Sequence, residues 1–178
     1  PGNGGIVMQE SYTLEKFNSG RTVVGDAITE LAKTDDRIWL LTPDIGWGCA
    51  DFKAAYSGRF IDTGIAERCV VGVSAGLALE GSIPFIIGMM PFMSMRDLEQ
   101  VRTDLCYQNL PVRIIANYSG LTGNGGSTHY AMEDMALFSS PRNLKVSQFS
   151  SALSSGNTIG LLRYSGSRSF LPSSFGME

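Results

Sequence analysis

A carboxylate occupies the point where a short strand is expected to pass into a helix. Glu67 ends the segment Asp62-Thr-Gly-Ile-Ala-Glu67 and falls in the first turn of an apolar helix expected over residues 64–80. The partial positive charge of a helix N-terminus favours a carboxylate there, so Glu67 could be a simple helix-start charge. A carboxyl at such a junction is also a group that can take or give a proton. Both interpretations stay open at this point.

Other polar candidates each have an ordinary structural explanation. His129 is the only histidine and follows a glycine-rich loop over residues 117–128. A histidine there is often structural or solvated, and it is also the side chain whose charge changes near neutral pH. Asp44 follows Pro43, and an aspartate after proline commonly forms a turn. Arg96 lies among acidic residues on an expected helix, where it could form surface ion pairs.

The elements that must position these residues alternate between strand and helix. Strands are expected at 37–42, 59–62, 83–88, 111–116 and 143–146, and helices at 22–34, 64–80, 95–107 and 130–138. Because the strands are apolar on both faces, the pattern predicts an α/β fold, a three-layer α/β/α domain with a mainly parallel sheet. Asp44, Glu67, residues 89–96 and residues 117–129 all follow strands, so we expect them to gather along one edge of the sheet.

Composition limits the function classes. The 178 residues are 43% hydrophobic and 17% charged, which indicates a globular chain with one core. The net charge of -3 is scattered, so nucleic acid and membrane surfaces are not expected partners. The apolar run at 83–92 is too short to span a bilayer. Three dispersed cysteines predict reduced thiols and a cytoplasmic protein.

Domain organisation follows from the same pass along the chain. Residues 1–20 are glycine-rich and then polar, which predicts an N-terminal leader or a lid over a partner. Residues 21–178 are expected to form a single domain. From about residue 147 the chain becomes rich in serine and loses clear apolar periodicity, so this last segment is atypical, with 161–164 as a possible final strand.

A longer pattern around Glu67 resembles a known family. Asp62 to Glu67, followed by Gly72-x-x-Ala75-Gly-Leu-Ala78-x-x-Gly81-x-x-Pro84, is similar to the pyrimidine-binding domain of transketolases and deoxyxylulose-phosphate synthases. Further matches follow in order and with the spacing kept: Phe92, Arg96, Glu99 to Arg102, Asn109 to Val112, Gly120 to Thr122, Thr128-His129, Glu133-Asp134 and Pro141 to Asn143. Several separated matches are far more specific than any one alone. The chain most resembles the separate C-terminal section of a split transketolase, so the resemblance implies the pyrimidine domain of the thiamine-diphosphate-binding fold.

The resemblance implies roles on the cofactor side of the site. Glu67 would contact the aminopyrimidine ring nitrogen of thiamine diphosphate, favouring the imino tautomer that acts as base on the thiazolium carbon. Phe92 would form an aromatic wall against the pyrimidine, although core packing explains it equally well. Asp44 would lie near the cofactor and a dimer contact, and Arg96 on the cofactor side or at an interface.

The resemblance also implies roles on the substrate side. His129 would contact the substrate and would count, with Glu67, as catalytic. Arg168 would contact a sugar phosphate, and Asn117 stands where many relatives have a phosphate-binding histidine. Gly125 stands where transketolases have an acid that meets a substrate hydroxyl. These departures put an ordinary ketose phosphate in doubt, because a lost buried hydrogen bond changes selectivity.

The implied activity is two-carbon ketol transfer between sugars, as one subunit of a larger assembly. The family binds diphosphate and magnesium through a Gly-Asp-Gly motif followed by Asn, which is absent here apart from Gly25-Asp26-Ala27 inside a helix. Magnesium ligands are therefore expected on a partner chain, the diphosphate-binding N-terminal section, in a homo- or hetero-oligomer. Two alternatives remain: acyl transfer or decarboxylation of a 2-oxo acid, as in deoxyxylulose synthase or a pyruvate dehydrogenase beta subunit, and a degenerate, non-catalytic partner subunit.

Overall fold

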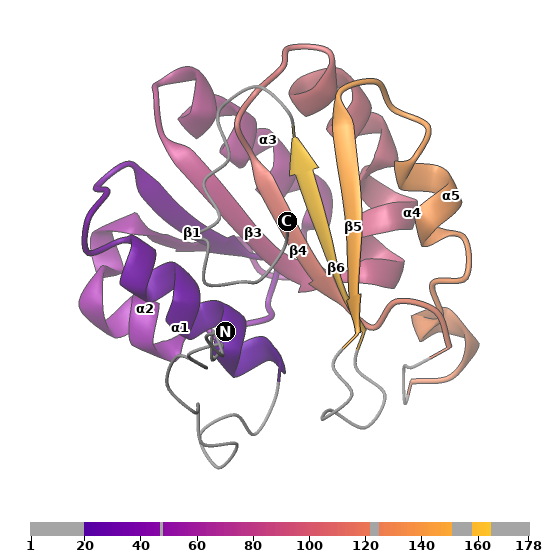
Figure 1. Ribbon diagram of the computed structural model, residues 1–178, viewed down its shortest axis with the longest axis horizontal. Helices are drawn as coiled ribbons and strands as arrows, with labels where there is room; N and C mark the ends of the chain where they lie inside the picture. Colours follow the sequence, from indigo (N-terminus) through magenta and orange to yellow (C-terminus); the bar gives the residue numbers. More distant parts are fainter. Residues whose placement is uncertain (1–19, 47, 122–124, 151–157, 165–178) are drawn as a thin grey trace, which may run out of the picture.

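A twisted sheet forms the centre of the molecule (Figure 1), and the computed structural model describes residues 20–46, 48–121, 125–150 and 158–164. Within these residues the sheet has six strands in the order β2-β1-β3-β4-β6-β5. Their bounds are β1 Ile38–Thr42, β2 Phe60–Asp62, β3 Ile83–Met89, β4 Arg113–Asn117, β5 Leu144–Ser150 and β6 Thr158–Tyr164. The leader predicted at 1–20 lies outside the described residues except for Gly20.

Strand direction sets where the loops meet. β1 pairs in parallel with β2 and β3, and β3 pairs in parallel with β4. β6 is antiparallel to both of its neighbours, β4 and β5, so β5 runs in the same direction as β1 to β4. The carboxyl ends of these strands point to the lower edge of the molecule in Figure 1. The predicted mainly parallel sheet is confirmed, with β6 as the reversed strand.

Helices cover both faces of the sheet, as the pattern of doubly apolar strands predicted. On one face lie α1 (Gly20–Leu31) and α2 (Ala50–Ala55); on the other lie α3 (Glu67–Leu79), α4 (Met90–Gln100), its π-helical continuation η3 (Val101–Cys106) and α5 (Asp134–Phe138). Alternate residues of one strand enter different cores: Leu40 packs with the α1 and α2 side chains, and Leu41 packs with those of α3 and α4. This alternation is the period of a strand, and it confirms the three-layer α/β/α architecture.

Two elements differ from the sequence predictions. α4 begins at Met90, directly after β3, although the helix was predicted from Met95. Pro91 in its first turn suits a helix start, because proline lacks the N–H that a first turn leaves unpaired. Residues 50–55 form the helix α2, where an irregular segment was predicted, and Phe52 anchors it in the core.

The atypical segment contributes to the sheet. β5 continues to Ser150, and β6 inserts between β4 and β5, with Ile115 opposite Leu161 on one side and Ser147 opposite Leu161 on the other. A strand was predicted at 161–164, and it begins three residues earlier, at Thr158. Across the described part of the chain, helices long and apolar enough to cross a bilayer were not found.

Candidate active site

Glu67 lies at the carboxyl edge of the sheet, where β2 passes into α3. The connecting turn contains Gly64, which has a left-handed φ of 65°, and α3 begins at Glu67 itself. The Glu67 residue is only 5% exposed although it is charged. A carboxylate in the first helical turn is favoured by the helix dipole, but burial to this degree requires a specific partner as well.

Arg96 is that partner. Its Nη1 donates to both oxygens of the Glu67 carboxylate at 2.8 Å each, which joins the N-terminus of α3 to the middle of α4. Next along the chain, Arg68 Nε donates to the carbonyl oxygen of Arg96 at 2.9 Å. The Arg96 side chain is 46% exposed, so it reaches solvent while it holds a buried carboxylate. The alternative of ion pairs along the surface of its own helix is therefore wrong for Arg96.

Phe92 and His129 complete a cluster around this ion pair. The Arg96 guanidinium lies over the Phe92 ring, 4.4 Å from its centroid, one helical turn further along α4. His129 meets the same ring edge-on, with centroids 5.1 Å apart and an interplanar angle of 74°. Glu67, Arg96, Phe92 and His129 thus come together from α3, α4 and the loop after β4. The sequence predicted that these segments would share one edge of the sheet. In the structure Glu67 contacts Arg96, Arg96 contacts Phe92, and Phe92 contacts His129.

The loop that carries His129 is closed by contacts at its base. Gly120 and Ala131 exchange two backbone hydrogen bonds of 3.1 and 2.9 Å, and the Ser119 hydroxyl donates to the Asp134 carboxylate at the start of α5. At the other end of the loop, a turn of 3-10 helix over Ser127–His129 holds the imidazole, whose Nδ1 lies 2.9 Å from the Thr128 hydroxyl. These contacts fix His129 beside Phe92 rather than leaving it on a free loop.

Gly125 is required by the position of His129. A Cβ atom placed on Gly125 would lie 2.3 Å from Nδ1 and 2.4 Å from Cγ of the imidazole, closer than atoms can approach. A side chain at this position would therefore have to push His129 away from Phe92. The glycine and the present placement of His129 depend on each other, which the sequence alone did not reveal.

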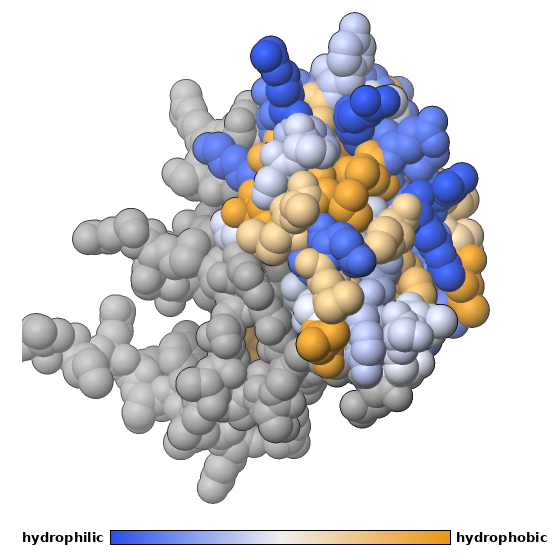
Figure 2. All heavy atoms as spheres, turned by 90° about the vertical axis from the view of Figure 1, so that its right-hand side faces the viewer, coloured by the Kyte–Doolittle hydropathy of each residue, from blue (hydrophilic) through white to orange (hydrophobic). Residues whose placement is uncertain are grey.

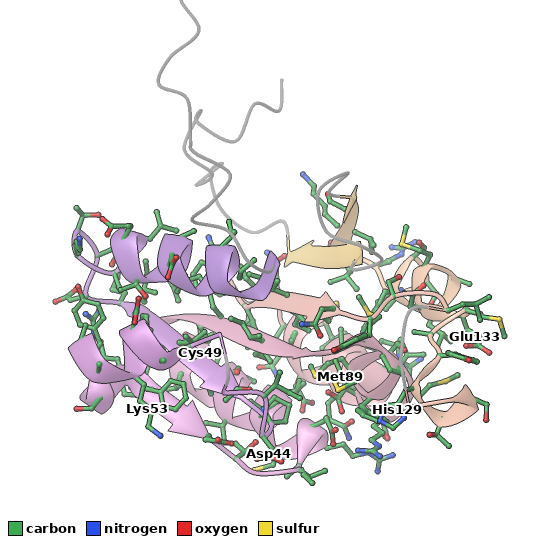
Figure 3. All side chains as sticks on the ribbon, turned by 90° about the horizontal axis from the view of Figure 1, so that it is seen from below. Asp44, Cys49, Lys53, Met89, His129 and Glu133 are labelled. Carbon is green, nitrogen blue, oxygen red and sulfur yellow. The ribbon has the colours of Figure 1, made fainter. Side chains whose placement is uncertain are left out.

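Asp44 lies on the same edge but away from this cluster. Figure 3 looks onto the carboxyl edge, with Asp44, Met89 and His129 all on view and Asp44 towards the β1 and β2 side. Asp44 is exposed, has a left-handed φ of 62°, and its N–H donates to Oδ1 of Asp62 at 3.0 Å. The same oxygen accepts the N–H of Gly64 at 3.0 Å. Asp62, which sequence reasoning did not single out, therefore ties the loops after β1 and β2 together.

The two remaining predicted substrate residues differ in what can be said of them. Asn117 is the last residue of β4, opposite Met89 of β3, and it is only 4% exposed. Its position at the carboxyl edge agrees with the expectation, but its burial leaves little surface for a ligand in this conformation. Arg168 lies outside the described residues.

Asp97 is a buried carboxyl that sequence reasoning missed. It is 0% exposed, and neither of its oxygens has a hydrogen-bond partner among the residues the structure describes. The pKa of Asp97 is raised to about 8, first by burial and then by the nearby Glu67 carboxylate, while Arg68 and Arg96 oppose the shift. Asp97 therefore carries its proton at neutral pH. The missed signal was the spacing of Met90, Met93 and Val101, which places residue 97 on the inner face once the helix starts at 90.

The geometry defines what the site can do chemically. It offers a buried carboxylate held by a partly exposed arginine, an aromatic ring beside it, and an imidazole that titrates near neutral pH in other proteins. Such a set can bind a flat heterocycle that has a ring nitrogen and can govern its protonation. In the described ranges, no three His, Cys, Asp or Glu side chains lie together as a metal site.

Comparison with known proteins places this geometry in a family context. The family profile described as "Transketolase, pyrimidine binding domain" matches residues 18–157. A 1-deoxy-D-xylulose-5-phosphate synthase of Clostridium perfringens is 38% identical over 125 residues, which cover 68% of this chain and 20% of that protein. A 1-deoxy-D-xylulose-5-phosphate synthase 1 of Geobacter metallireducens is 40% identical over 127 residues, which cover 70% of this chain and 20% of that protein. The chain thus spans about a fifth of the length of these relatives.

Solved structures show the same fold. A structure described as "Split gene transketolase, inactive beta4 tetramer" is 36% identical, with a TM-score of 0.61, and the match covers 69% of this chain and 40% of that one. The transketolase of Leishmania mexicana is 21% identical with a TM-score of 0.62, and the match covers 69% of this chain and 20% of that one. At the latter identity the similarity supports the fold alone.

Proposed function

The chain belongs to the family of transketolase pyrimidine-binding domains, and on that premise we propose that it binds the aminopyrimidine half of thiamine diphosphate in an enzyme that transfers two-carbon ketol units between sugars. When bound, this cofactor supplies the electron sink that the transfer requires. The task of this chain is to hold the pyrimidine ring and to control its protonation.

One observation carries the proposal: a buried carboxylate, Glu67, lies at the carboxyl edge of the sheet, and the arginine that holds it, Arg96, lies over the Phe92 ring. Ligands of α/β sheets bind at this edge. Glu67 can present a carboxyl to a ring nitrogen, and Phe92 can support the ring by stacking. Arg96 holds Glu67 in the chain as it stands, and because its side chain is partly exposed it has room to turn aside; the bonds that the ring makes to the buried Glu67 must then offset the bonds lost to Arg96. The donor set therefore fits the pyrimidine.

The remaining half of the cofactor needs a partner chain in this proposal. A diphosphate-binding chain would hold the diphosphate and magnesium, which takes oxygen ligands from carboxylates and phosphates. Support comes from the similarity to a split-gene transketolase and from exposed apolar residues on and beside α4 and α5: Met95, Met132 and Met135. Figure 2 looks onto the side of the molecule where α5 lies, and apolar side chains gather in its middle among charged ones. Such a surface suits burial against another chain.

Substrate contacts are proposed for His129, Asn117 and Arg168, and a cofactor-side contact for Asp44. His129 is the best placed of these, since it lies beside Phe92 at the edge of the cluster. Gly125 next to it offers a substrate hydroxyl no side chain. We therefore expect binding of the donor to depend less on a phosphate group than binding of a common ketose phosphate does, or the donor to carry a different set of hydroxyls.

A second candidate activity has support from named relatives. Several proteins that are 35–40% identical to this chain are 1-deoxy-D-xylulose-5-phosphate synthases. The alternative is therefore acyl transfer from, or decarboxylation of, a 2-oxo acid. Glu67 would serve either reaction, so the donor decides between them: a complex that consumes a 2-oxo acid and ignores ketoses belongs to the second class.

The function is tested by replacing the carboxyl of Glu67. Glu67→Gln keeps the size of the side chain but removes its proton chemistry, so turnover of the complex reconstituted with the partner should fall by about 10²- to 10⁴-fold. Glu80→Gln, at the exposed far end of the same helix, is the matched control and should keep the unmodified rate. If Glu67→Gln retains turnover close to that of the control, the proposed role of Glu67 is wrong.

Partner dependence has a separate test by calorimetry. With magnesium present, we expect the isolated chain to bind thiamine diphosphate weakly or not at all, and the complex with the partner to bind it tightly. The reason is that most of the charge of the cofactor is on its diphosphate, for which this chain is proposed to supply no ligands. Tight binding by the chain alone would refute the split-enzyme arrangement, and a chain that never gains affinity or activity with a partner would favour the non-catalytic alternative.

A further inference from the structure

The inner face of α4 carries a row of polar groups that the packing leaves without partners. The Ser94 hydroxyl, both Asp97 oxygens and Oε1 of Gln100 are buried, and none has a hydrogen-bond partner among the described residues. They are three residues apart, so they lie along one side of the helix, and we call them the polar row. Buried polar atoms are nearly always paired, because leaving one unpaired costs the full penalty of removing it from water. Three in a row therefore call for an explanation.

The part of α4 that carries Asp97 packs against the N-terminus of α3, where Glu67 lies. Two contacts join these elements at the residue next to Asp97: the ion pair of Arg96 with Glu67, and the bond from Arg68 Nε to the Arg96 carbonyl. The charges that act on the Asp97 carboxyl are Glu67 and Arg68 on α3 and Arg96 on α4 itself. Asp97 and Glu67 are thus two buried carboxyls of one site, and Arg96 interacts with both.

Three other ionisable groups on elements packed against α4 have partners of their own. Asp134 of α5 accepts the Ser119 hydroxyl, and His129 of the 3-10 turn contacts the Thr128 hydroxyl. Asp104 of η3 accepts the Thr103 hydroxyl at 2.8 Å. Asp97 is therefore the carboxyl of this neighbourhood that is both fully buried and unpartnered.

The two carboxyls are in opposite protonation states. Both oxygens of Glu67 accept hydrogen bonds from Arg96, which is the geometry of a carboxylate. Asp97, by contrast, holds its proton at neutral pH, because burial raises its pKa to about 8, with Glu67 adding to the effect. Paired carboxyls whose environments separate their protonation in this way are a common arrangement for acid–base work.

A carboxylate alone cannot serve a neutral ring nitrogen, because both groups are acceptors of hydrogen bonds. A proton must therefore reach Glu67 when Arg96 turns aside and the site is filled. We propose that Asp97 is a second functional carboxyl of this site, which stores that proton and passes it to Glu67. This inference rests on the proposed function and deepens it.

The transfer balances with groups present in the chain. The O–H bond of Asp97 breaks and an O–H bond forms on Glu67, so one proton moves and the total charge is unchanged. The carboxylate left on Asp97 is then stabilised by Arg68, which already lowers its pKa. Asp97 acts through Glu67 and is a positioning residue in this scheme.

The first experiment uses the chain alone, so that it does not depend on activity. With carbon-13 at the aspartate side-chain carboxyls, an NMR titration follows each aspartate, and Asp97→Asn identifies the Asp97 signal. We expect a midpoint near 8, and we expect Glu67→Gln to lower it, because the neighbouring carboxylate raises the Asp97 pKa. Glu80→Gln, on the same helix, should leave the midpoint unchanged. A midpoint that does not respond to Glu67→Gln means that the two carboxyls are not coupled, and it overturns the proposal.

The second experiment measures turnover of the reconstituted complex against pH. Asp97→Asn should lower kcat about tenfold or more, short of the loss for Glu67→Gln, and should remove the inflection that the Asp97 proton gives to the profile. Affinity for thiamine diphosphate should change little, because Asn keeps the size of the side chain. Equal profiles for Asp97→Asn and the unmodified complex overturn the proposal even if the NMR coupling is found. Absence of activity in the unmodified complex is a different outcome, which refutes the proposed function itself.

Discussion

Asp97 should give the isolated chain an unusual dependence of stability on pH. In the unfolded chain its carboxyl has the ordinary pKa near 3.8, and in the fold the pKa is about 8. Between these values the folded state binds one proton more than the unfolded state, so stability falls as pH rises. The contribution of Asp97 to the free energy of unfolding is greatest below about pH 4, is lost progressively towards pH 8, and stays constant above that. Most acidic groups in proteins make stability rise with pH instead, because their pKa values are lowered on folding.

The magnitude follows from the single proton. One proton of difference changes the free energy of unfolding by about 1.36 kcal/mol per pH unit. From about pH 4 to pH 7 the loss is therefore about 4 kcal/mol, a large part of the roughly 5–15 kcal/mol that stabilises an ordinary domain. Full burial of Asp97 justifies this conversion, since solvent does not screen the carboxyl.

The assay is urea unfolding followed by circular dichroism at several pH values between 5 and 8. Asp97→Asn replaces the carboxyl by a group that does not titrate, so the difference between unmodified and variant chains should slope by about 1.36 kcal/mol per pH unit. Asp51→Asn, an exposed aspartate on α2, is the control and should keep the slope of the unmodified chain. Equal slopes for Asp97→Asn and the unmodified chain would refute the raised pKa and the reasoning built on it.

Three further predictions concern the loop after β4. Gly125→Ala should displace His129 from Phe92, because the added Cβ meets the imidazole, and the His129 NMR signals should shift while the unfolding midpoint changes little. His129→Ala should raise the Michaelis constant of the complex more than it weakens cofactor binding, and an unchanged Michaelis constant would exclude substrate contact. Asp134→Ala removes the carboxylate that accepts the bond from the buried Ser119 hydroxyl and should cost about 1–3 kcal/mol in urea unfolding; Glu133→Ala, exposed and adjacent, serves as its control.

A donor panel tests the prediction about the substrate. Phosphorylated ketoses, free ketoses and 2-oxo acids are compared on the reconstituted complex. Gly125 has no side chain and Asn117 is buried. We therefore expect the complex to prefer phosphorylated over free ketoses less strongly than an enzyme that uses a common ketose phosphate does. A strong preference for an ordinary ketose phosphate would mean that other groups bind the phosphate, and Arg168→Ala would be the first variant to examine.

The sequence determined the fold class and the main candidate residue because both depend on local pattern. Apolar strands alternating with helices predicted the three layers, and the strand-to-helix junction at Asp62 to Glu67 predicted a carboxylate at the carboxyl edge. Boundaries were less accurate. The start of α4 was placed at Met95 rather than Met90, since the methionine and proline run after β3 was taken for the connection that follows the strand.

The tertiary structure alone decided which partners meet. Glu67 and Arg96 are 29 residues apart, and no local period indicates that α4 turns this arginine towards α3. The charged residues of α4 suggested a solvated surface, yet Asp97 is buried, because packing against α3 decides which side of the helix is inside. In the same way, only the folded chain shows that Gly125 leaves room for His129. Sequence fixes which side chains are available along each element, whereas burial, pairing and protonation depend on distances between elements, which arise only when the layers pack.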